Sequence, residues 1–151
     1  MQLETRTDTA TYAPPRLVDQ QILHTGVPGE RPGDCMRACF ASIFDRHTLE
    51  VPHFAECGDD WWDVARGFVS RVSLGEYELM WFPYLPNPEV LASAWDLAPG
   101  LGVVLCGPSP RGDFNHAVVG DPATMAVVFD PHPSRAGLLS TDVVFGMVAA
   151  G

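Results

Sequence analysis

One amphipathic stretch, placed directly after a loop that cannot be regular structure, constrains the fold more than any other part of the sequence. Residues 26–33 are rich in glycine and proline, which favour turns and interrupt helices and strands. The spacing of the apolar residues after this loop predicts a helix that starts at Cys35 and ends near Arg46 and His47, with Asp34 as its N-cap. Its apolar side chains recur at i, i+3, i+4, i+7 and i+8, as in a helix buried on one face: Met36, Cys39, Phe40, Ile43 and Phe44.

The patterns that follow predict two more helices and an antiparallel sheet. An acidic pair precedes a predicted helix over residues 61–69, and Pro88 stands in the first turn of another over residues 87–97. Residues 17–24 are interpreted as a short strand or an extended segment. Helices followed by a β-meander predict an α+β fold in which the helix at Cys35 packs on the sheet. The predicted strands are residues 77–82, 102–106, 116–120, 125–130 and 143–148.

The chain is predicted to form one domain with a loose N-terminal arm. Its 151 residues are enough to bury a single substantial core. Residues 1–15 lack periodicity and end in two prolines, so we expect them to form the arm and residues 16–151 to form the domain. We expect all four cysteines to be reduced, because a core of this size needs no disulfide.

The charge and the apolar runs narrow the range of partners. Nine basic residues against 19 acidic ones give a formal net charge of −10, which disfavours binding to nucleic acid or to anionic membranes. The N-terminal residues do not resemble a secretory signal, and no apolar run approaches the roughly 20 residues that span a bilayer. The sequence therefore predicts a cytoplasmic protein without a membrane segment.

The order Cys35, His116, Asp130 is that of a thiol-based catalytic triad. At a helix start, the helix dipole and the free backbone amides stabilise a thiolate and a developing oxyanion. Residues 121–124 form a credible hairpin turn, which would pair two strands and set Asp130 beside His116. We therefore predict Cys35 as the nucleophile, His116 as the base and acid, and Asp130 as the group that orients the imidazole. The pKa of Cys35 is expected to lie well below the value of about 8.5 of a free thiol.

Competing interpretations of the cysteines are structural. A cysteine on an apolar helix face is most often part of the core, and we assign Cys39 to that role. Cys35 and Cys39 with His47 or His53 have no spacing typical of a zinc site, so no metal is predicted. The two other cysteines, Cys57 and Cys106, are also interpreted as structural.

Several other residues have a structural and a functional interpretation. His53 is expected to stabilise a turn and His132 to shape the loop after Asp130, unless either lines a substrate cleft. The pair at residues 61–62, Trp-Trp, is expected to cover the edge of the core, with a wall of an acyl pocket as the alternative. Arg111 lies in a loop just before His116, where it would grip an acidic group of a substrate.

Four segments of the sequence resemble a family of small, mostly uncharacterised bacterial and phage proteins. The segments are residues 33–43, 51–54, 116–120 and 130–134, and the resemblance extends over about residues 20–138. More distantly, the pattern resembles the papain-like leader-peptidase domains of bacteriocin exporters and the transglutaminase and papain superfamily. The resemblance implies a papain-like fold with Cys35, His116 and Asp130 as the triad, but it implies no substrate.

The oxyanion hole departs from that pattern. Leader peptidases and papain carry a glutamine about six residues before the nucleophile, and this chain has Gly29 there. Gln20 and Gln21 lie further upstream and could return to Cys35 through the loop, but nothing in the sequence requires either to do so. Oxyanion donors other than the Cys35 backbone amide are therefore unassigned.

The predicted function is that of a thiol hydrolase or acyltransferase, similar to a cysteine peptidase or amidase. It would act through an acyl-enzyme on a peptide or other small amide or acyl substrate, without a cofactor or metal. One alternative is a catalytically inactive papain-like domain that serves as a binding module. Another is an acyltransferase that modifies a peptide or a small molecule in a biosynthetic or phage pathway. The sequence does not indicate which substrate is used or which oligomer forms.

Overall fold

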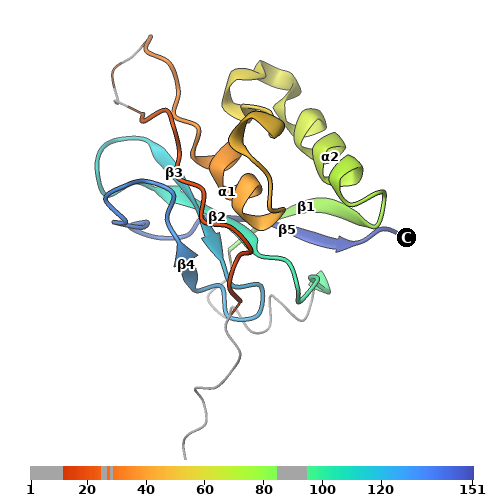
Figure 1. Ribbon diagram of the computed structural model, residues 1–151. Coiled ribbons are helices and arrows are strands. Elements are labelled where there is room, and N and C mark those ends of the chain that lie inside the picture. The colour runs from red at the N-terminus through yellow and green to blue at the C-terminus, as the bar shows by residue number, and fades with distance from the viewer. Residues whose placement is uncertain (1–11, 25–26, 28, 85–94) are drawn as a thin grey trace, which may run out of the picture.

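The computed structural model describes residues 12–24, 27, 29–84 and 95–151, in which five strands form one antiparallel sheet (Figure 1). The strands lie side by side in the order β1-β5-β2-β3-β4. Strands β2, β3 and β4 form a meander, and β5 inserts between β1 and β2 and pairs with both. The predicted α+β class with an antiparallel sheet is therefore confirmed. The strand bounds are β1 (Tyr77–Pro83), β2 (Val103–Pro108), β3 (Asn115–Gly120), β4 (Val127–Phe129) and β5 (Val143–Ala149).

Two α-helices, α1 (Cys35–Ile43) and α2 (Trp61–Val72), lie on the same side of the sheet (Figure 1). Helix α1 contacts β3 and β2, whereas α2 contacts β1. The helices thus divide the sheet between them, and α1 lies over the half that carries His116. Short 3-10 helices lie between α1 and α2 in the chain: η2 (Thr48–Glu50), η3 (Phe54–Glu56) and η4 (Gly58–Asp60).

Three phenylalanine rings pack together between the two helices. Phe40 on α1 meets Phe54 and Phe68 edge to face, with ring centroids 5.2 Å and 6.1 Å apart. All three side chains are buried. Burial of one such side chain stabilises a protein by about 1.5–3 kcal/mol, so this cluster fixes α1 and α2 against one another.

Side chains of β2 alternate between two apolar clusters on opposite faces of the sheet. Val103 and Leu105 belong to the cluster on the face away from the helices, and Val104 belongs to the cluster beneath them. Cys106 continues the alternation and packs on the helix side. The strand period therefore directs the Cys106 thiol toward α1.

Helix α1 starts at Cys35 as predicted, but its end and its capping contact differ from the prediction. It ends at Ile43, several residues before the predicted end, and Asp45 then takes a left-handed backbone conformation with φ 55°. Asp34 occupies the N-cap position, but its side chain makes no capping hydrogen bond. Its Oδ1 instead accepts hydrogen bonds from the backbone N–H groups of Gln21 and Ile22, each 2.9 Å long. Asp34 therefore ties the incoming chain to the start of α1, which corrects its predicted role.

The other elements match the predicted types more closely than the predicted bounds. Helix α2 starts at Trp61 as predicted and continues to Val72, while β4 is shorter than the predicted strand at residues 125–130. Residues 17–24 form no strand. The predicted helix at residues 87–97 lies outside the described residues except for its last three. None of the helices in the described ranges has the length and apolar character needed to cross a bilayer.

Part of the predicted arm is attached to the domain. Residues 1–11 of that arm lie outside the described residues. Tyr12 packs against the core, and its backbone N–H donates a hydrogen bond of 2.8 Å to Oδ2 of Asp121. Tyr12, inside the predicted arm, is therefore tied to the domain.

Candidate active site

The start of α1 is held by the chain that precedes it. The backbone N–H of Asp34 donates a hydrogen bond of 3.1 Å to the carbonyl oxygen of Ile22. Gly33 passes so close to this segment that an added Cβ would lie 2.9 Å from the backbone nitrogen of His24. A side chain at position 33 would push the two segments apart, so this glycine allows the close approach that positions Cys35.

His116 on β3 and Asp130, directly after β4, form a buried pair. Nε2 of His116 lies 2.7 Å from Oδ1 of Asp130, and both side chains are almost inaccessible to solvent. The pairing of Val119 with Phe129 sets the register of β3 and β4, which brings Asp130 diagonally across from His116. The hairpin therefore makes these two residues neighbours, as the sequence predicts.

Hydrogen bonds hold Asp130 in its ionised form. Burial by itself would raise the pKa of this carboxyl, but hydrogen bonds from His116 and from the backbone N–H groups of His132 and Gly137 outweigh it and lower the pKa. The two backbone bonds are 2.9 Å and 2.7 Å long. An ionised carboxylate only accepts hydrogen bonds, so Nε2 of His116 carries the proton and Nδ1 is the basic nitrogen.

The imidazole itself is neutral at neutral pH. Burial lowers the pKa of His116, and the hydrogen bond and charge of Asp130 offset only part of this effect. The positive charge of Arg111 lowers the pKa of His116 further. The resting site therefore holds an uncharged base next to an ionised carboxylate.

The thiol of Cys35 is also neutral, which corrects the prediction of a low pKa. Burial raises the pKa of Cys35, and hydrogen bonding from the backbone N–H groups of Ala117 and Met36 offsets only part of that effect. The negative charge of Asp34 raises the pKa further. Within the described part of the chain, no hydrogen bond or ion pair joins Cys35 to His116. The helix start does direct amides toward the sulfur, but desolvation has the larger effect.

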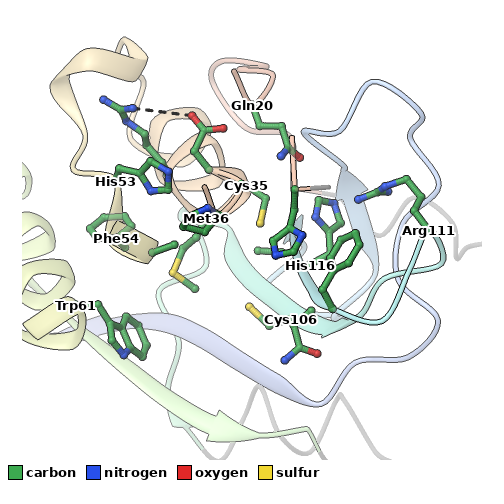
Figure 2. Close-up of a pocket in the computed structure, with 18 of the residues that line it drawn as sticks. Gln20, Cys35, Met36, His53, Phe54, Trp61, Cys106, Arg111 and His116 are labelled. Carbon is green, nitrogen blue, oxygen red and sulfur yellow. Dashed lines mark ion pairs between the residues drawn. The ribbon is translucent and has the colours of Figure 1, made fainter. Parts of the chain in front are cut away.

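A cavity of about 440 Å³ brings Cys35 and His116 to one surface (Figure 2). Gln20 and Arg111 line it on the side of His116, and an aromatic and apolar wall lies on the other side. Its volume suits a small ligand or one or two side chains of a peptide. The residues of the apolar wall are Met36, Phe54 and Trp61.

Gln20, which the sequence allowed but did not require to reach the site, lines the cavity. Its side chain is buried, and its backbone N–H donates a hydrogen bond of 3.0 Å to the carbonyl oxygen of Pro131, next to Asp130. Its Nε2 donates one hydrogen bond of 2.9 Å to the carbonyl oxygen of Ile22, which leaves a second N–H on the same nitrogen. Gly29, at the predicted glutamine position, does not line the cavity. No local pattern signals Gln20, because only the return of the loop brings it to the site.

The structure corrects the interpretation of Cys106 and agrees with those of Trp61, Cys39 and His132. Cys106, interpreted as structural, lines the cavity, and so does Trp61, which also packs against the core. Burial raises the pKa of the Cys106 thiol far above its ordinary value. Cys39 is fully buried, as expected of a core cysteine. His132 shapes the loop after Asp130 as predicted, because its Nδ1 accepts a hydrogen bond of 3.0 Å from a backbone N–H two residues later.

The described residues contain no group of three or more histidine, cysteine, aspartate or glutamate side chains that is suited to a metal ion. All four cysteines are free thiols. No protein-family model matches the chain, and no match was found among curated proteins or among solved structures.

Proposed function

We propose that this protein is a papain-like thiol hydrolase or acyltransferase that acts on a peptide or other amide bond. The observation that supports this most strongly is the buried pair of His116 and Asp130, whose histidine lines the same cavity as a cysteine at the first turn of a helix. A cysteine on α1, a histidine on β3 and an aspartate directly after β4 fit the roles of a nucleophile, a base and a group that orients the base.

The mechanism starts from neutral groups. When a carbonyl group enters the cavity, Cys35 attacks its carbon and the thiol proton passes to Nδ1 of His116. The imidazolium that results donates from Nε2 to the ionised Asp130, which stabilises it. His116 then returns the proton to the leaving amine, and water or another acceptor resolves the acyl-enzyme.

Two donors are candidates for stabilising the oxyanion. The first is the backbone N–H of Cys35 at the start of α1, where backbone amides have no partner within the helix. The second is the remaining N–H on Nε2 of Gln20, whose buried amide lines the same cavity. Gln20 would thus supply from 15 residues upstream of Cys35 the donor that papain supplies from about six.

The pKa directions favour a second candidate function, a binding domain without catalysis. Burial raises the pKa of Cys35 and lowers that of His116, so both displacements oppose transfer of the thiol proton to the imidazole. A domain that only binds peptides would show the same resting state. The two candidates differ in whether Cys35 becomes nucleophilic with the help of His116.

Alkylation by iodoacetamide at graded pH, read by peptide mass mapping, separates these candidates. If His116 assists the thiol, Cys35 in the native protein reacts faster than the partly exposed Cys57, and substitution His116→Ala removes that advantage. Cys57 is the matched control in the same spectra, because it is a partly buried thiol outside the cavity. Equal rates at Cys35 in the native protein and in the His116→Ala variant would refute the catalytic proposal and leave the binding domain.

A further inference from the structure

Polar atoms without a hydrogen-bond partner gather around the cavity. Among the described residues, five buried side-chain nitrogen or oxygen atoms lack a partner. Four of them belong to residues that line the cavity, namely Oε1 of Gln20, Oδ2 of Asp34 and both ring nitrogens of His53. Buried polar groups are destabilising when they stay unpaired, so their concentration at one cavity points to a ligand that supplies the missing partners.

Asp34 and His53 are brought together by one arginine. Nε of Arg37 donates a hydrogen bond of 2.7 Å to the carbonyl oxygen of Val51, two residues before His53. NH1 of the same guanidinium lies 3.9 Å from Oδ2 of Asp34. Figure 2 shows His53 beside this ion pair, on the same side of the cavity as Met36 and Phe54.

The carboxylate of Asp34 keeps a free acceptor although its charge is balanced. Its side chain is fully buried, and the backbone N–H groups of Gln21 and Ile22 occupy Oδ1. The separation of 3.9 Å from Arg37 is too long for a hydrogen bond. Oδ2 therefore gains charge compensation from the guanidinium but no donated proton.

His53 adds a hydrogen-bond donor to the acceptor that Asp34 provides. A neutral imidazole has one N–H donor and one acceptor nitrogen, whichever tautomer forms. Neither nitrogen of His53 has a partner, so the residues of this wall hold an unused donor on the ring and an unused acceptor on Asp34, both buried directly behind the cavity surface. The apolar groups next to them are the side chains of Met36, Phe54 and Trp61.

A primary carboxamide matches this combination better than a charged group does. Its carbonyl oxygen accepts one hydrogen bond and its NH2 group donates two, all in one plane. A carboxylate in the same place would lie against the carboxylate of Asp34, and an ammonium would lie against the guanidinium of Arg37 while offering no acceptor to His53. A methylene stem would contact the apolar wall.

We propose that this part of the cavity is a subsite for a carboxamide side chain, such as that of glutamine or asparagine, which Asp34 and His53 hold without cleaving it. Asp34 and Met36 flank Cys35 in the chain, so a carboxamide held here would lie beside the bond that Cys35 attacks. This placement beside the scissile bond rests on the proposed function. Binding of the carboxamide itself does not require a reactive thiol.

The test compares four small probes by NMR titration of the native protein, with the imidazole signals of His53 as the readout. The probes are the N-acetyl methylamides of glutamine, methionine, glutamate and lysine. The glutamine compound is expected to bind at least about tenfold more tightly than the methionine compound, which has similar size but lacks the carboxamide. It should also shift the His53 signals more than the two charged compounds do.

Two variants test whether His53 is responsible for the preference for the glutamine probe. In His53→Phe the ratio of affinities for the glutamine and methionine probes should fall to near one. His24, also on the cavity and stacked on Phe114, supplies the matched substitution His24→Phe, which should keep that ratio. If His53→Phe does not fold, the ratio and the His53 shifts in the native protein still decide the question.

The outcomes also separate this inference from the proposed function. A native protein that shows no preference for the glutamine probe overturns the carboxamide subsite, even if iodoacetamide shows a His116-dependent thiol. A clear preference together with an unassisted thiol supports the subsite and refutes the hydrolase.

Discussion

Substitution Asp130→Asn tests the candidate site through stability and through the titration of His116. The Asp130 carboxylate accepts three hydrogen bonds in a buried position, from His116 at 2.7 Å, His132 at 2.9 Å and Gly137 at 2.7 Å. In the variant, Oδ1 can retain the two bonds that it accepts, but they lose the assistance of a charge. The amide nitrogen then faces the backbone N–H of Gly137, so two donors oppose one another.

The magnitude follows from these three bonds. An unpaired buried N–H costs about 1–3 kcal/mol, and the change from a charged to a neutral acceptor costs about 1 kcal/mol for each remaining bond. The expected loss in free energy of unfolding at pH 7 is therefore about 3–5 kcal/mol. That is a large share of the roughly 5–15 kcal/mol that stabilise a typical domain.

The loss should depend on pH in one direction. Folding lowers the pKa of Asp130, so its ionised form stabilises the native state above the unfolded-state pKa of about 3.9, and this contribution is lost as the pH falls through the folded-state value. Urea unfolding at pH 7 and near pH 3 should therefore give a smaller difference between the two proteins at the lower pH. Because Asp130 raises the pKa of His116, NMR titration of the variant should show a His116 pKa below that of the native protein.

The control is Asp113→Asn, since Asp113 is exposed in the turn before β3. It should change stability by no more than about 0.5 kcal/mol, as surface substitutions usually do. A loss below about 1 kcal/mol in Asp130→Asn at pH 7, or a difference that does not shrink near pH 3, would refute the reasoning about the buried pair.

Two further predictions concern the oxyanion donor and the strand that faces His116. Gln20→Ala should slow acylation of Cys35 by an activated ester by about 10²–10³-fold while leaving iodoacetamide labelling within a fewfold, because alkylation forms no oxyanion; equal slowing of both reactions would contradict the role. Gly107→Ala should lower the urea midpoint by the equivalent of at least about 1–3 kcal/mol, because an added Cβ would lie 1.9 Å from the carbonyl oxygen of Ser140. Since Gly107 pairs with His116, the His116 signals should move in that variant, whereas Gly100→Ala, with open space around its Cβ, should move neither.

The sequence was most informative where one periodicity decides the structure. The apolar stripe after Cys35 predicts the start of α1 and the face that it buries, and the turn at residues 121–124 predicts the pairing that sets Asp130 beside His116. These are local patterns, in which a few neighbouring residues determine the backbone geometry.

Features that depend on several distant segments were missed or left open. Gln20 reaches the cavity only because the chain returns through hydrogen bonds at Ile22 and Pro131. The pKa of Cys35 was predicted in the wrong direction, because the helix dipole is readable from sequence whereas desolvation sums the contacts of the whole fold. Cys106 illustrates the same limit. Alternation along β2 predicts that Cys106 lies on the same face as Val104, but it does not predict that this face borders a cavity.

The neutral resting state is compatible with catalysis because of how charge moves in the site. With Asp130 already ionised, transfer of a proton from Cys35 to His116 leaves the net charge of the three groups unchanged at −1. The imidazolium then lies between a thiolate and a carboxylate, so burial strengthens the attractions that stabilise it as well as raising the cost of forming the thiolate. Burial of the thiol opposes the transfer most, and the positive charge of Arg111 opposes it by lowering the pKa of His116. Asp34 adds to this opposition, because its negative charge raises the pKa of Cys35. A neutral carboxamide that donates a hydrogen bond to Oδ2 of Asp34 would weaken that opposition, so an occupied subsite would favour the thiolate where an empty one does not.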